Sequence, residues 1–252
     1  AGAMLVALKD WGRAIPVLEA YRAGYPQSER QADVTRNLAL AYLEGGRPGE
    51  AAGEFERIAA SSAEPPEVQR EALWQAAALY EKSSQQARAM AAYESYVQRF
   101  PAPLAEAVEA RLKLADAARE SGDFMGRRKW LTGIVEADGA AGTARTDRSR
   151  YLAALATLEL TTADRDAFRS IALVAPLKQS LASKKAAMER ALAGYRSAQS
   201  YSVAEVTTAA TYETGELYRQ LASDLMKSER PANLDAEELE RHNRELATKA
   251  HV

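Results

Sequence analysis

Two histidines are the side chains of this 252-residue chain best suited to hold a metal ion, and both lie near its C-terminal end. A zinc-binding pair on a helix needs ligands at positions i and i+4, which share one face. His242 and His251 are nine positions apart and do not share a face in this way. The chain also contains no cysteine, which excludes thiolate ligands and disulfides. We therefore expect no metal site and no other cofactor.

Acidic residues are numerous enough to suggest acid–base chemistry, but their positions favour a structural role. Glu237 and Glu238 stand at the start of an expected helix, where negative charge is stabilised by the helix dipole. The sequence has no glycine-rich phosphate loop, no G-x-S-x-G nucleophile elbow and no H-E-x-x-H motif. Gly45 and Gly46 fall between two expected helices, which is typical of a turn. We expect no catalytic residues and no enzymatic activity.

A basic segment lies between residues 165 and 196. It could bind an acidic partner or the anionic polymer of a cell wall, or it could be the solvated outer face of a long helix. Nucleic acid is not an expected partner, because the net charge is −2 and no exposed aromatic residues alternate with the basic ones. The basic patch predicted here consists of Lys178, Lys184, Lys185 and Arg190.

The elements that carry these residues are predicted to be helices. Hydrophobic residues make up 47% of the chain and aromatic residues only 7%, and alanine is abundant, a composition that favours closely packed helices. No apolar run reaches the ~18 residues of a membrane span, so no direct membrane span is expected. The first helix is already half complete at residue 1, so we expect the true N-terminus to lie upstream.

A repeat organises the chain. The residues that open the second helix of each pair recur every 37 to 40 positions. Large apolar residues follow four and seven positions later, which places all three on one helical face. Such a period is typical of stacked helix pairs that cannot bury their apolar faces alone. The opening residues are Ala14, Ala51, Ala89, Arg127 and Ala167.

This pattern is similar to the tetratricopeptide repeat (TPR) family. The motif positions of that family are matched by Leu38, Ala39, Tyr42, Ala51, Phe55 and Ile58. The resemblance implies an all-α fold, a TPR-like α-solenoid of antiparallel helix pairs wound as a right-handed superhelix. Residues 1–138 would form the array, with its first repeat truncated, and residues 139–146 a loop. Residues 147–252 would hold a degenerate TPR-like repeat, a long helical hairpin and a terminal capping helix.

The resemblance also implies a binding surface. First helices of TPR pairs line the concave face, where peptides or helices of other proteins bind. Trp74 is either an exposed anchor on this face or part of the packing between repeats. The family's inner positions correspond here to Asp33, Arg36, Leu40, Leu43, Glu44, Glu71, Trp74, Glu81, Lys82, Leu112, Asp116 and Arg119.

Helix starts and ends have local signals. Pro48 and Pro66 suit first helical positions, and Pro176 suits the start of a long helix that ends near Ser200. A second long helix would then run to about Lys227. Three capping pairs are predicted, Ser28 with Gln31, Ser202 with Glu205, and Asp235 with Glu238.

The C-terminal part, residues 177–245, resembles bacterial TPR proteins of the cell envelope that accompany TonB/Tol-type or gliding-type systems. The resemblance rests on V-T-T-A-A-T-Y at 206–212 and L-M-K-S-E-R-P at 225–231. It implies a periplasmic or envelope-associated location, with the cytoplasm as the alternative. We therefore expect a scaffold that binds other proteins of an envelope complex. The alternative is a structural, homo-oligomeric envelope component without a free peptide groove.

Overall fold

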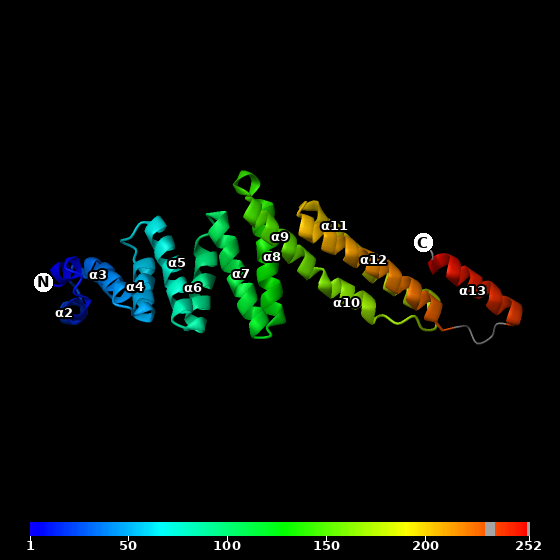
Figure 1. Ribbon diagram of the computed structural model, residues 1–252, viewed down its shortest axis with the longest axis horizontal. Coiled ribbons are helices and arrows are strands. Elements are labelled where there is room, and N and C mark those ends of the chain that lie inside the picture. Colours follow the sequence, from blue (N-terminus) through cyan, green and yellow to red (C-terminus); the bar gives the residue numbers. More distant parts are fainter. Residues whose placement is uncertain (230–234, 251–252) are drawn as a thin grey trace. The chain divides into compact units, whose positions relative to one another are not determined.

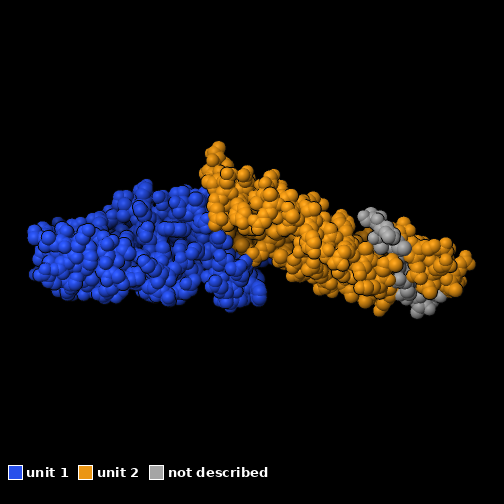
Figure 2. Space-filling view, in the orientation of Figure 1, with its two compact units in different colours: residues 1–130 blue, residues 131–252 orange. Residues whose placement is uncertain are grey.

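The computed structural model describes residues 1–229 and 235–250. Within these ranges the regular structure is entirely helical, which confirms the predicted all-α class. The chain divides into two compact units, residues 1–130 and 131–252 (Figure 2). The division falls within α8 (Phe124–Ala140), eight residues before the boundary at residue 138 that the repeat spacing predicted.

Unit 1 is a series of antiparallel helix pairs, in which each helix packs on the next along the chain (Figure 1). This arrangement is the TPR-like solenoid expected from the repeat. The helices are α1 (Gly2–Ala7), α2 (Trp11–Gly24), α3 (Gln31–Glu44), α4 (Pro48–Ala60), α5 (Pro66–Lys82), α6 (Gln86–Arg99) and α7 (Leu104–Glu120).

The core of unit 1 alternates small residues at the helix crossings with large ones in the gaps. Ala14, Ala51 and Ala89 are completely buried, as the repeat predicted. Tyr80 and Tyr93 are among the largest side chains that are fully enclosed. Alanine lets the backbones approach closely, and the tyrosines fill the space between layers.

Several predicted helix boundaries of unit 1 are confirmed. Pro48 and Pro66 are the first residues of α4 and α5, where the missing N–H of proline has no helical partner to lose. Gly46 and Gly122 have φ of +75° and +74° in the turns before α4 and α8, a conformation that side chains with a Cβ disfavour.

Unit 2 contains the end of α8, a 3₁₀ turn at Gly142–Ala144, α9 (Asp147–Leu160), α10 (Thr162–Ser170), α11 (Leu177–Ser200), α12 (Ala204–Lys227) and α13 (Ala236–Ala250). The long hairpin predicted from residue 177 is present as α11 and α12, which lie side by side (Figure 1). Because α8 continues to Ala140 and a 3₁₀ turn follows, the irregular stretch is shorter than the predicted loop at 139–146.

The three predicted capping pairs have different outcomes. Asp235 and Glu238 do cap α13, since each side chain accepts a hydrogen bond from the other's backbone N–H, at 2.8 and 3.2 Å. The prediction for Ser202 was wrong, because its φ of +57° places it in the turn and Val203 precedes α12 without a side-chain cap. The prediction for Ser28 was also wrong, because its hydroxyl contacts Tyr21, and α3 begins three residues later, at Gln31, with Arg30 before it and no side-chain cap. The second long helix, predicted to run to about Lys227, does end there as α12, and Pro231 after it lies outside the described residues.

Candidate functional site

The α3 part of the predicted binding face is open to solvent. All five of its predicted residues are exposed. They include two leucines one helical turn apart, Leu40 at 43% and Leu43 at 36% exposure. Exposed leucines beside charged residues offer apolar area that a partner could bury. The charged neighbours on this helix are Asp33, Arg36 and Glu44.

On the α5 part of the face, some residues are exposed and others already make contacts within the chain. Glu71 and Lys82 are exposed. Glu81 is half-buried, because its carboxylate accepts a hydrogen bond from the Tyr93 hydroxyl at 3.1 Å and pairs with the Lys113 ammonium at 3.2 Å. Glu81 therefore holds α5, α6 and α7 together, which limits its availability to a partner.

Trp74 is half-buried and packs within unit 1. Its ring makes edge-on contacts with Tyr93 and Tyr96 of α6, with centroids 5.5 and 5.4 Å away. This geometry agrees with the packing alternative for Trp74. Its role as a binding anchor remains a prediction that rests on the part of its surface still exposed.

The α7 part of the face contributes fewer free groups. Leu112 and Asp116 are half-buried, and Arg119 is exposed. Asp116 is paired with Arg119 at 3.3 Å and with Arg127, at the start of α8, at 3.6 Å. The Asp116 carboxylate is therefore already neutralised within the chain.

Two ion pairs link successive helix pairs on this side of unit 1. Arg36 on α3 reaches the buried Glu64, just before α5, at 2.6 Å. Lys113 on α7 reaches Glu81 on α5 as described above. These pairs join α3 to the turn before α5, and α5 to α7. We call this surface, made of the twelve predicted residues, the first-helix face.

A contact that the sequence analysis missed occurs at two successive repeats. The Tyr42 hydroxyl on α3 donates to Glu19 on α2, and the Tyr80 hydroxyl on α5 donates to Glu56 on α4. An arginine covers each ring, Arg47 at 4.7 Å and Arg88 at 4.1 Å from the ring centroids. The signal was available, because Glu19 and Glu56 are 37 residues apart and Tyr42 and Tyr80 are 38 apart.

Burial and the hydrogen bond to a carboxylate both affect the titration of these tyrosines. Burial disfavours the phenolate, and the neighbouring Glu19 disfavours it further, so that the pKa of Tyr42 is raised to about 12. The same two causes raise the pKa of Tyr80, with Glu56 as its partner. Both phenols therefore remain hydrogen-bond donors at neutral pH.

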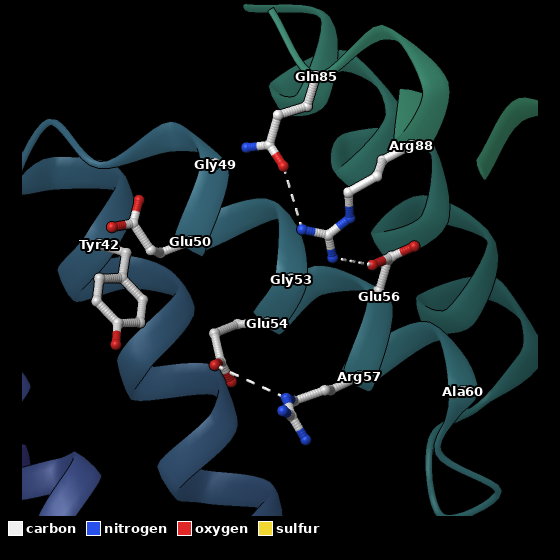
Figure 3. A pocket seen from close by; sticks show the side chains of 10 residues that line it. All are labelled: Tyr42, Gly49, Glu50, Gly53, Glu54, Glu56, Arg57, Ala60, Gln85 and Arg88. Atoms are coloured by element: carbon white, nitrogen blue, oxygen red, sulfur yellow. Dashed lines mark hydrogen bonds and ion pairs between the residues drawn. The ribbon is translucent and has the colours of Figure 1, made fainter. Parts of the chain in front are cut away.

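A pocket of about 600 Å³ lies along α4, flanked by Tyr42 on one side and by Gln85 and Arg88 on the other (Figure 3). Its charged groups are paired within the chain. Arg88 lies between Gln85 and Glu56, and Arg57 faces Glu54, which is also bound by Arg22 at 2.8 Å. The pocket therefore presents a neutralised surface and not an unmatched charge.

The predicted basic patch includes one residue that is not at the surface. Lys184 is completely buried, so its assignment to a solvated patch was wrong. Its ammonium pairs with Asp224 on α12 at 2.7 Å and donates to the carbonyls of Phe168 and Ile171 at 3.0 and 2.8 Å. The apolar stripe of α11 runs from Leu177 through Leu181 to Met188 and skips one turn, and Lys184 occupies the missing position.

The other three residues of the basic patch are exposed. Lys178 and Lys185 lie on the outer surface of α11. Arg190 pairs with Asp164 on α10 at 3.2 Å. Two exposed lysines make a weak electrostatic site, since exposed charges are strongly screened.

We also searched the described residues for other kinds of site. Among the residues whose side chains the structure describes, no three His, Asp or Glu residues lie close enough together to hold a metal ion. None of the described helices is both long and apolar enough to cross a membrane.

Comparison with known proteins identifies one repeat directly. Residues 71–102, which cover most of α5 and all of α6, match the tetratricopeptide repeat model. No curated protein matches the chain. The matched segment includes Glu71, Trp74, Glu81 and Lys82 of the first-helix face. A tetratricopeptide repeat at 71–102, within a series of similarly packed helix pairs, makes this chain similar to proteins that act as protein–protein interaction scaffolds.

Proposed function

We propose that this chain is a non-catalytic scaffold that binds a peptide or helix of another protein on its first-helix face. The observation that carries the proposal is the exposure of Leu40 and Leu43 on α3, beside charged residues, within a TPR-like array. If a partner buried these two leucines, the complex would be stabilised by about 25 cal/mol for each Å² of apolar surface removed from water. The ion pairs around them would select orientation and partner more than they add affinity.

The test is affinity capture from the source cell, followed by hydrogen exchange on the purified complex. We expect the wild-type chain to retain a partner. Leu40→Glu/Leu43→Glu should lower the affinity for that partner by about tenfold or more, which corresponds to a loss of about 1.4 kcal/mol of binding free energy. Tyr212→Glu, which changes an exposed tyrosine of α12, is the matched control and should retain the partner. Amides of α3 and α5 should be protected in the complex. A partner that the double variant retains, or that protects only unit 2, would refute the proposal.

A structural, homo-oligomeric role is the second candidate. It is favoured by Phe124 and Met125, adjacent apolar residues at the start of α8 that are 84% and 76% exposed. Two such residues could form the centre of a self-association surface. Light scattering over a range of concentrations tests this role. A mass that rises with concentration, and falls to that of the monomer in Phe124→Ser/Met125→Ser, would support it.

We further propose that the scaffold works in a bacterial cell envelope, with other components of an envelope complex as its partners. The support is the resemblance of residues 177–245 to envelope TPR proteins. Protease protection of the full-length protein in spheroplasts and in intact cells tests the location. Digestion in spheroplasts but not in intact cells is the expected result, and protection until lysis would show a cytoplasmic protein instead.

A further inference from the structure

We infer that the segment bound on the first-helix face is a basic amphipathic helix, an inference that rests on the proposed function. The charges of this face that make no ion pair within the described chain are mainly negative. A charge that is already paired inside the chain offers little to a partner, because a new contact must replace an existing one. The unpaired charges therefore determine which ligand the face prefers.

Most cations of the face are already engaged. Arg36 contacts both Asp33 at 3.1 Å and Glu64 at 2.6 Å, so one guanidinium serves two carboxylates. Arg119 is engaged with Asp116 at 3.3 Å. Outside the predicted set, Lys113 is likewise engaged with Glu81. These positive groups can contribute little to the capture of an acidic ligand.

The uncommitted groups are mainly acidic. Glu44 at the end of α3 and Glu71 on α5 are exposed and make no ion pair with any residue in the described ranges. Lys82 at the end of α5 is the uncommitted cation among the predicted face residues that the structure describes. Two carboxylates against one ammonium leave the face complementary to a basic ligand.

The acidic groups also lie beside the apolar ones. Glu44 follows Leu43 directly and lies four residues after Leu40, so all three share one exposed side of α3. Glu71 lies one turn before Trp74 on α5. A helix with an apolar ridge could rest on the leucines while its flanking lysines or arginines approach Glu44 and Glu71.

The experiment compares two designed peptides with the intact chain. Both are helical, about 18 residues long, with identical leucines at i, i+3, i+4 and i+7 spacing. One has lysine and the other glutamate at every flanking position. Fluorescence anisotropy gives the Kd of each peptide, with salt at about 50 and about 150 mM.

We expect the basic peptide to bind about tenfold or more tightly than the acidic one, and the preference to shrink at the higher salt. Glu44→Gln/Glu71→Gln should reduce the preference about threefold or more, because it removes both unpaired carboxylates of the described face. Lys82→Gln is the matched control, and it should leave the preference unchanged or increase it. Leu40→Ala/Leu43→Ala should weaken both peptides.

The possible failures separate the inference from the function on which it rests. One failure is that the two peptides bind equally, or that the acidic peptide binds more tightly, while binding still depends on Leu40 and Leu43. This result would overturn the inference of a basic ligand but would still support the first-helix face as the binding surface. Binding that is indifferent to both leucines would reject the face itself. Absence of binding by either peptide would also overturn the inference, since the stated ligand chemistry would then be insufficient.

Discussion

The Lys184 ammonium lies 2.7 Å from the Asp224 carboxylate and connects the two long helices of unit 2. The same ammonium donates to the carbonyls of Phe168 and Ile171, at the C-terminal end of α10. Last-turn carbonyls have no helical donor and carry the negative end of the helix dipole, so a cation is favourable there. One side chain thus joins α10, α11 and α12.

Lys184→Met should destabilise the chain by about 3–5 kcal/mol, because it leaves Asp224 and two carbonyls without their buried cation. Urea unfolding followed by far-UV circular dichroism measures the loss. Lys185→Met, one position along and exposed, is the control and should change stability by less than about 0.5 kcal/mol. Equal effects of the two substitutions would show that the buried contacts do not stabilise unit 2.

Gly194→Ala should also destabilise unit 2, by about 1–3 kcal/mol. A Cβ at Gly194 would lie 2.7 Å from Cγ2 of Thr161, so α11 could not keep its close approach to the end of α9. Gly215→Ala is the matched control, since nothing lies within 4 Å of its Cβ and alanine favours a helix by up to about 1 kcal/mol. Thermal unfolding should shift in opposite directions for the two variants, and a neutral or stabilising Gly194→Ala would contradict the close packing.

Trp74→Ala should lower the stability of unit 1 by about 2–4 kcal/mol, because the indole packs on Tyr93 and Tyr96. Leu40→Ala also changes a residue of the first-helix face, but an exposed one, and should lower the free energy of unfolding by less than about 1 kcal/mol. Chemical denaturation of both variants makes the comparison. If Trp74→Ala retained wild-type stability, the contacts of the indole with Tyr93 and Tyr96 would be dispensable, and binding through its exposed edge would better explain the residue.

Stability should decline between pH 10 and pH 12. The pKa of Tyr42 and that of Tyr96 are each raised to about 12, mainly by burial, whereas an unfolded tyrosine has a pKa of about 10. Above pH 10 the unfolded chain therefore releases protons that the native chain keeps, and unfolding becomes easier as pH rises. Each such tyrosine contributes about 1.4 kcal/mol per pH unit until its native pKa is reached.

Urea unfolding at about pH 9.5 and about pH 11 measures this dependence. Tyr42→Phe should have a shallower decline than wild type, because one of the titrating groups is gone. An equally steep decline in Tyr42→Phe would assign the effect to other residues.

The sequence predicted the parts of this fold that depend on short-range spacing. Proline at first helical positions and alanine at crossings act within one turn or one pair, so Pro48 and Ala51 could be interpreted without tertiary information. Lys184 could not, because its burial depends on Asp224, forty positions away, and charge alone favours a surface position. The same limit applies to the first-helix face. Its exposure followed from the repeat, whereas the pairing of Glu81 with Lys113 emerged only once α5 and α7 were placed together.

The hydrogen bonds of Tyr42 and Tyr80 span only 23 and 24 residues of sequence. Contacts of such short range need little loop closure, so each helix pair can form soon after it leaves the ribosome, without waiting for distant segments. The third repeat boundary has Ala118 where the tyrosines stand, and there Glu94 meets Lys129 at 3.2 Å without a phenol between them. An exposed ion pair is weakened by salt, whereas a buried phenolic hydrogen bond is weakened far less. High ionic strength should therefore fray unit 1 first at α7, giving the array a preferred end from which to unravel.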